Sequence, residues 1–229
     1  MIIPFISLMT GAYLLGSVPA AYLAVKWSRG VDIRKVGTGK VGASNVLSAG
    51  LKWMVVPVAI FDIGKGALSV WIAQIIGLST VQQVVIGLLA VVGHNWPVFL
   101  KFTGGGRGVL ASLGVITIFS WKLGLIVLVL AYAWAPLRQV ALGVFIGLLA
   151  LPFFSWFLAE PLDIEEKLTI TMGFVAICLM GLLKRLIAPR TELSKKVPWG
   201  EIIFNRLFFD RDISDRRLWT SKGSAGKGQ

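Results

Sequence analysis

Residues 54–77 read MVVPVAIFDIGKGALSVWIAQIIG, an apolar stretch that is interrupted by only two charges. A membrane's hydrocarbon core takes about 20 helical residues, so this stretch is long enough to cross it as one helix. Asp62 and Lys65 are three residues apart and therefore share one helix face. Charges inside a span are costly and usually pair or face a cavity. The stretch predicts a membrane span that carries either a structural ion pair or part of a functional site.

Similar apolar runs fill most of the chain. The chain is 56% hydrophobic and only 15% charged, whereas a soluble domain is about one quarter charged. We expect an all-α polytopic membrane protein. The predicted spans are roughly 3–25, 54–77, 81–100, 109–121, 123–136, 139–158 and 168–187.

The runs 109–121 and 123–136 are shorter than the others and are divided by Trp121 and Lys122. If both cross the membrane, the chain has seven spans. If neither fully crosses, the two form a re-entrant pair and the chain has five. Seven is the favoured prediction.

Positive charge is distributed unevenly between the loops. Lys and Arg outnumber acids in loops 26–52 and 101–108 and from Lys184 onward, whereas the connection 159–167 is acidic. Because basic loops stay in the cytoplasm, we expect an N-terminus outside the cell membrane and a cytoplasmic C-terminus. The net charge of +12 comes from residues that flank apolar runs. It therefore predicts contact with anionic membrane lipids and not with nucleic acid.

The chain divides into a membrane domain over 1–190 and a cytoplasmic tail over 191–229. Within the tail, residues 199–219 interleave aromatic and aliphatic residues with arginines. This pattern predicts either an amphipathic helix on the inner leaflet or a short helix packed on the cytoplasmic loops. We expect the last residues, 221–229, to be disordered.

Two glycine-rich loops on the same predicted side carry cations and hydroxyl groups. The first, 37–45, reads GTGKVGASN, and Asn45 stands where it could cap a following helix. The second, 104–108, reads GGGRG and follows the chain's single histidine, His94. Glycine lets backbone N–H groups turn toward an anion, and histidine can take a proton near neutral pH. Two anion cradles suit a reaction between two phosphorylated molecules, although a basic capped loop and a structural histidine remain alternatives.

Several motifs follow one another between residues 11 and 192. They are GSVP at 16–19, DIRK at 32–35, GTGKVGASN at 37–45, DIGKG at 62–66 and GHNWPVFLKF at 93–102. In this order they resemble the bacterial acylphosphate-dependent glycerol-3-phosphate acyltransferase family. That family moves an acyl group from a long-chain acyl phosphate to the 1-hydroxyl of glycerol-3-phosphate at the cytoplasmic face. The products are lysophosphatidic acid, a phospholipid precursor, and phosphate.

The resemblance implies a seven-span fold with glycine-rich cytoplasmic loops forming the site, and neither a metal nor a cofactor. It implies that Thr38, Asn45 and His94 lie at the reacting centre. It also implies a substrate-binding set of Arg34, Lys35, Gly37, Gly39, Lys40, Gly42, Ser44, Asp62, Lys65, Gly104, Gly105, Arg107, Gly108, Lys184, Arg185 and Glu192.

The chain departs from the family pattern at several positions. Lys40 replaces an asparagine, the second glycine loop has an extra residue and Arg107 in place of lysine, and Leu179 and Leu182 stand near the places of a histidine and an asparagine. These departures keep a second hypothesis open. It is a divergent relative with an altered substrate or without catalysis, which binds or transports anions or lipids.

Overall fold

The computed structural model describes residues 2–221, and every regular element in them is helical. The all-helical prediction is therefore confirmed over this range. The α-helices are α1 (Ile2–Ser17), α2 (Ala20–Arg29), α3 (Ala43–Ser48), α4 (Val55–Ile75), α5 (Thr80–Asn95), α6 (Val109–Phe119), α7 (Trp121–Tyr132), α8 (Val140–Phe157), α9 (Lys167–Leu186), α10 (Trp199–Phe209) and α11 (Arg216–Ser221).

Five segments are long and apolar enough to cross a membrane. They are Ile2–Arg29, Lys52–Ile75, Thr80–Leu100, Val140–Phe157 and Lys167–Leu186. In the first of these segments, α1 and α2 are separated at Val18 and Pro19 because proline lacks the N–H that a helix interior requires.

Helices α6 and α7 are shorter and meet at Ser120, which is in an extended conformation with φ −156°. The Ser120 hydroxyl donates to the Leu162 carbonyl over 2.7 Å, and the Lys122 ammonium lies 2.8 Å from the Asp163 carboxylate. The turn between α6 and α7 therefore lies at the same end of the bundle as the α8–α9 connection.

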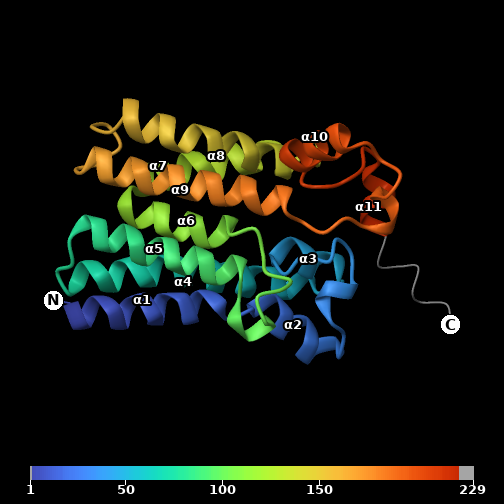
Figure 1. Ribbon diagram of the computed structural model, residues 1–229, viewed down its shortest axis with the longest axis horizontal. Coiled ribbons are helices and arrows are strands. Elements are labelled where there is room, and N and C mark those ends of the chain that lie inside the picture. Colours follow the sequence, from blue (N-terminus) through green and yellow to red (C-terminus); the bar gives the residue numbers. More distant parts are fainter. Residues whose placement is uncertain (1, 222–229) are drawn as a thin grey trace.

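The long helices form a bundle in which α1, α4 and α5 lie side by side, with α7, α8 and α9 on the opposite side of α6 (Figure 1). Helix α6 is apolar around its circumference and is buried at six consecutive positions, 111–116. It packs closely against α4, where Gly66 faces the Ala111 backbone and Gly114 faces the Ile63 backbone. In a membrane, small residues at such crossings allow the close packing that holds helices together.

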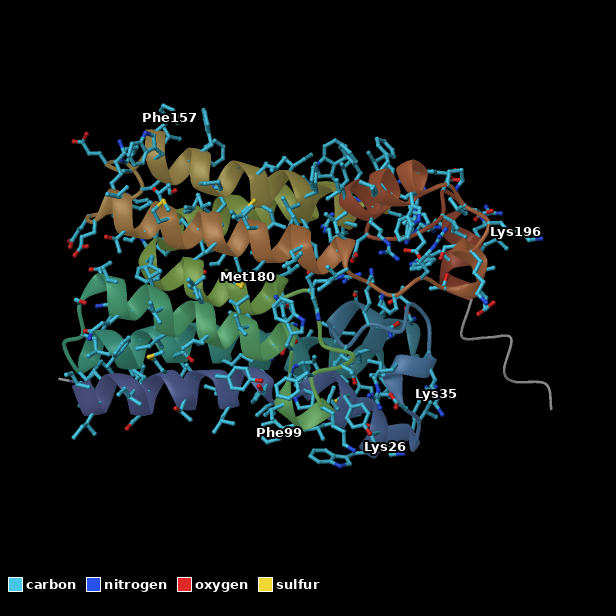
Figure 2. All side chains as sticks on the ribbon, in the orientation of Figure 1. Lys26, Lys35, Phe99, Phe157, Met180 and Lys196 are labelled. Atoms are coloured by element: carbon cyan, nitrogen blue, oxygen red, sulfur yellow. The ribbon has the colours of Figure 1, made fainter. Side chains whose placement is uncertain are left out.

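The end of the bundle opposite the N-terminus carries α2, α3, α10, α11 and the glycine-rich loops (Figure 1). Lys26, Lys35 and Lys196 lie at this end, whereas Phe157 lies at the other (Figure 2). We call it the loop end. The charged loops that the sequence assigns to one side of the membrane are therefore gathered at one end of the structure.

One helix was expected over residues 199–219. The structure instead has two helices in this part of the chain, α10 and α11. Asp210 ends α10 in a left-handed conformation with φ 52°, which stops the helix. Helix α10 packs against α8 and α9, with Ile202 fully buried, while Trp199 and Phe204 are exposed. One face of α10 is thus packed on the bundle, and lipid contact by the other face stays a prediction. The predicted disordered end lies almost entirely outside the described residues.

Candidate active site

A cavity of about 670 Å³ lies between the two glycine-rich loops at the loop end. We call it the polar cavity because several Lys and Arg side chains line it. The predicted site residues that line it are Arg34, Lys35, Gly37, Thr38, Gly39, Lys40, Gly104, Gly105, Arg107 and Lys184. The tertiary structure therefore brings both loops and the basic end of α9 around one space.

A second cavity, of about 380 Å³, extends between α6, α7 and α8. We call it the apolar cavity. Its lining includes the predicted residues Thr38, Lys40, Gly42, Ser44, Asp62, His94, Arg107 and Arg185. Its depth is lined mainly by aliphatic side chains, among them Leu110, Leu113, Val127, Leu128 and Val144. Six residues line both cavities, so they form a shared wall: Thr38, Lys40, Arg107, Asp210, Arg211 and Trp219.

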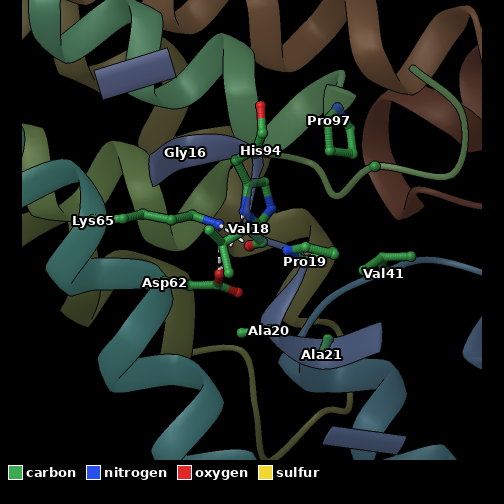
Figure 3. A pocket seen from close by; sticks show the side chains of 12 residues that line it. Gly16, Val18, Pro19, Ala20, Ala21, Val41, Asp62, Lys65, His94 and Pro97 are labelled. Atoms are coloured by element: carbon green, nitrogen blue, oxygen red, sulfur yellow. Dashed lines mark hydrogen bonds and ion pairs between the residues drawn. The ribbon is translucent and has the colours of Figure 1, made fainter. Parts of the chain in front are cut away.

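Three buried ionisable groups, Asp62, Lys65 and His94, meet in a small pocket beside residues 16–21 (Figure 3), and Asp62 and His94 also line the apolar cavity. The Lys65 ammonium lies 2.8 Å from Asp62 Oδ1, and His94 Nδ1 lies 3.5 Å from the same oxygen. Lys65 also donates to the Val18 carbonyl at 3.4 Å. The ion pair that the sequence offered as one alternative is therefore formed, and Asp62 is shared between Lys65 and His94.

The orientation of His94 leaves its second ring nitrogen directed toward the second glycine loop. A side chain at Gly106 would collide with His94 Nε2, and the Gly106 N–H donates to the His94 carbonyl over 3.1 Å. Gly106 also lines the apolar cavity. Nδ1 therefore faces the Asp62 carboxylate, whereas Nε2 faces Gly106 of the second glycine loop.

The sequence suggested that Asn45 could cap a helix, but the structure gives the cap position to another residue. Gly42 occupies the cap position of α3, and Asn45 lies within the helix at 1% exposure. Its amide group donates to the carbonyls of Ile33, Val36 and Lys40. Its amide oxygen accepts the Thr38 N–H at 3.1 Å. Asn45 therefore holds the first loop in shape from beneath, because its polar atoms are used by that loop.

The first loop presents side chains rather than a full backbone cradle. The Thr38 N–H is bonded to Asn45, and the Gly39 N–H donates to the Val36 carbonyl at 3.0 Å. Gly37 adopts φ 55°, and a side chain there would collide with Asn45. The buried Thr38 hydroxyl has no hydrogen-bond partner within residues 2–221. A polar group in this state is available to a ligand.

A carboxylate from the tail joins the shared wall of the cavities. Asp210 Oδ2 lies 2.5 Å from the Lys40 ammonium, and Asp210 Oδ1 lies 2.9 Å from Arg107 Nη2. Burial lowers the pKa of Lys40 to about 8, although Asp210 opposes this effect. Burial acts to raise the pKa of Asp210, but Lys40, Arg107 and Arg185 outweigh it and hold that pKa at about 2. Near neutral pH, Lys40 is therefore mostly protonated and Asp210 is ionised.

Three further predicted cations, Arg34, Lys184 and Arg185, are held by local partners. The Arg34 guanidinium lies 2.7 Å from the Asp32 carboxylate, an interaction that lowers the pKa of Asp32. The Lys184 ammonium lies 4.6 Å from the centre of the Trp96 ring. Arg185 donates to the Ala141 carbonyl over 2.9 Å and to the Leu207 carbonyl. Arg185 therefore also ties the tail to the bundle.

Four predicted residues lie outside both cavities, namely Asn45 and Lys65, described above, and Glu192 and Gly108. Glu192 is paired with Lys195 on the surface, and its side chain is 83% exposed. Gly108 precedes α6 with φ 73° and shapes the start of that helix. Sequence reasoning missed Gly106 and Asp210. The extra residue of the second loop was a signal for Gly106, whereas Asp210 belonged to a segment interpreted only as amphipathic.

The fold and the site define a helical membrane protein in which a cationic cavity adjoins an apolar one. A model of the glycerol-3-phosphate acyltransferase family matches residues 6–188. The chain belongs to this family and is an acyltransferase of the multi-pass membrane type.

Individual relatives agree with this assignment. The chain is 44% identical over 221 residues to glycerol-3-phosphate acyltransferase 5 of Dehalococcoides mccartyi, covering 96% of this chain and 94% of that protein. It is also similar to crystal structures of PlsY (YgiH), described as an integral membrane glycerol 3-phosphate acyltransferase. For the glycerol 3-phosphate form the TM-score is 0.71 and the identity is 29%, over 80% of this chain and 88% of that one. A lysophosphatidic acid form matches with a TM-score of 0.69 and 28% identity, over the same shares of the two chains.

Proposed function

We propose that the protein transfers a fatty acyl group from an acyl phosphate to the 1-hydroxyl of glycerol-3-phosphate, giving lysophosphatidic acid and phosphate. The observation that carries the proposal is the shared wall, where Thr38, Lys40 and Arg107 line both the polar and the apolar cavity. A donor with a phosphate head and an acyl chain fits across such a wall. PlsY has crystal structures in a glycerol 3-phosphate form and in a lysophosphatidic acid form, which support this acceptor and this product.

The polar cavity suits glycerol-3-phosphate. Lys35, just before the first glycine loop, and Lys184, in the last turn of α9, both line it, and its volume of about 670 Å³ accommodates a small polar molecule. Lysine ammonium groups attract the phosphate, and the hydroxyl groups of the substrate can bond to loop residues. We assign this cavity to the acceptor.

The apolar cavity suits the acyl chain of the donor. Leu110 and Leu113 of α6 face Val127 of α7 and Val144 of α8 across it. Leu128, which also lines the cavity, is 37% exposed. The cavity thus reaches the outer surface of α7, where a chain dissolved in the membrane can enter from the side.

The reaction needs orientation and charge stabilisation more than a covalent enzyme intermediate, because acyl phosphate is already activated. The 1-hydroxyl oxygen bonds to the acyl carbon, and the bond from that carbon to the phosphate oxygen breaks. The phosphate leaves with the electron pair, next to Lys40 and Arg107. The hydroxyl proton passes to His94 Nε2, whose positive charge the Asp62 carboxylate stabilises, and then to the departing phosphate.

The direct test is phosphate release by purified protein in lipid nanodiscs that is given palmitoyl phosphate, with and without glycerol-3-phosphate. We expect release only when both are present, with lysophosphatidic acid appearing in equal amount by mass spectrometry. A standard family member serves as the control. Binding of either substrate without turnover, beside an active control, would instead establish the non-catalytic hypothesis.

We further propose that the chain crosses the membrane seven times, with its N-terminus outside and both cavities on the cytoplasmic side. The position of the α6–α7 turn beside the acidic α8–α9 connection supports two short crossings. The clustering of basic loops at the loop end supports the orientation.

Single-cysteine variants test this topology after the native Cys178 is replaced by alanine. We expect an impermeant maleimide to label Ser79→Cys and Trp121→Cys in intact cells, and Lys196→Cys only after permeabilisation. Ser79 serves as the control because it lies in the uncharged α4–α5 connection. Labelling at position 79 but not at position 121 would show that α6 and α7 are re-entrant.

A further inference from the structure

Asp210 lies where the proposed reaction places a phosphate. Its two carboxylate oxygens contact Lys40 at 2.5 Å and Arg107 at 2.9 Å, and the Lys40 ammonium also donates to the Asp210 carbonyl at 2.6 Å. Asp210 lines both cavities, as Lys40 and Arg107 do. A carboxylate and a phosphate both present anionic oxygens to such cations, so they compete for the same ion-pair partners.

The tail is anchored so that Asp210 stays at this position. Arg206 forms a buried ion pair with Asp212 at 2.7 Å and donates to the Leu186 carbonyl at 2.5 Å. Arg185 donates to the Leu207 carbonyl. Both arginines tie the segment around Asp210 to the end of α9. This anchoring does not use the Asp210 carboxylate, which leaves that group able to exchange its partners.

The pairing joins the family-matched part of the chain to the tail. Lys40 lies within residues 6–188, which the family model matches, whereas Asp210 lies beyond them. Lys40, Arg107 and Arg211 all line both cavities, and Asp210 balances part of their positive charge.

Resting on the proposed function, we propose that Asp210 is a specificity-determining residue that occupies the phosphate position of the shared wall until a substrate phosphate displaces it. The tail thereby sets the affinity of the site for phosphate groups. An anion that binds to Lys40 and Arg107 must compete with a carboxylate already present. Weakly bound anions, including the phosphate product, are therefore held less tightly than the cations alone would hold them.

The test compares Asp210→Asn with Glu201→Gln, which removes the same charge from an exposed position on α10 outside both cavities. At pH 7, we expect Asp210→Asn to lower the Kd of inorganic phosphate and the KM of palmitoyl phosphate about tenfold. We expect Glu201→Gln to leave both constants unchanged. Unchanged or weaker phosphate binding in a folded Asp210→Asn protein would overturn the proposal.

A second comparison can be made even if Asp210→Asn alone does not fold. Lys40→Asn and the double variant Lys40→Asn/Asp210→Asn differ only in the carboxylate, and in the double variant neither residue is charged. We expect the double variant to bind inorganic phosphate more tightly than Lys40→Asn does. The gain in affinity should be smaller than that of Asp210→Asn over the wild type, because Lys40, one of the cations for which carboxylate and phosphate compete, is gone. Equal binding by these two variants would count against displacement.

Phosphate binding is measured without turnover, which separates the two proposals. If no variant releases phosphate from palmitoyl phosphate but Asp210→Asn binds phosphate more tightly, the proposed reaction fails while Asp210 still occupies an anion site. If all variants turn over with the same constants, the reaction stands and the role of Asp210 is excluded.

Discussion

The His94→Gln variant should lose about 10²- to 10⁴-fold in kcat, the range that a positioned general base contributes. Glutamine approximates the volume of histidine and retains hydrogen-bonding groups, but it cannot take up a proton. His94 is positioned for this role because Nδ1 lies 3.5 Å from Asp62 and Nε2 faces Gly106 at the edge of the apolar cavity. The measurement is phosphate release in nanodiscs at saturating concentrations of both substrates.

Two further measurements distinguish proton transfer by His94 from a role in positioning the substrate. We expect the KM for glycerol-3-phosphate and the thermal unfolding midpoint of His94→Gln to stay close to those of the wild type. We also expect the wild-type pH–rate profile to show an ionisation that is missing in the variant. A kcat within tenfold of the wild type would mean that His94 only orients the substrate.

The Lys65→Met variant should be destabilised by about 3–5 kcal/mol, the usual cost of removing one partner from a buried ion pair. Lys65 and Asp62 are 3% and 2% exposed, and their charged atoms lie 2.8 Å apart. Without the ammonium, the Asp62 carboxylate remains buried and must be ionised at a cost or become protonated. Reversible unfolding in detergent measures the loss.

A matched control exists on the surface. Lys195 and Glu192 form an ion pair with the same sequence spacing and the same 2.8 Å separation, but their side chains are 66% and 83% exposed. Because exposed pairs contribute little, Lys195→Met should cost less than about 1 kcal/mol. The double variant Asp62→Asn/Lys65→Met should be more stable than Lys65→Met. An equal loss of unfolding free energy in Lys65→Met and Lys195→Met would show that burial does not determine the energy of the Asp62–Lys65 pair.

Much of the site could be read from local patterns in the sequence. The charges at positions 62 and 65 within an apolar run predicted a buried pair or a site, because ions in a span need partners. The glycines and cations of the two loops predicted a place for anions. His94 was identified as the candidate base because it is the single histidine of the chain.

The predictions for Asn45 and Glu192 show where local patterns were insufficient. A motif names residue types in order, but it does not say which polar atoms the backbone will use. Asn45 lies beneath the first loop, where that loop satisfies its side chain, and Glu192 lies on the surface. Asp210 was missed because its partner Lys40 is far away in the sequence, and no local pattern relates the two.

The sequence by itself therefore determined the elements of this protein: apolar helical runs, basic ends and two glycine-rich loops. These features depend on neighbours within a few residues, so periodicity and composition reveal them. The tertiary structure decided how the cavities join, which nitrogen of His94 faces the second glycine loop, and that the Asp210 carboxylate enters the wall beside Lys40. Those features depend on contacts between distant segments, which arise only when the helices pack and the tail folds back on them.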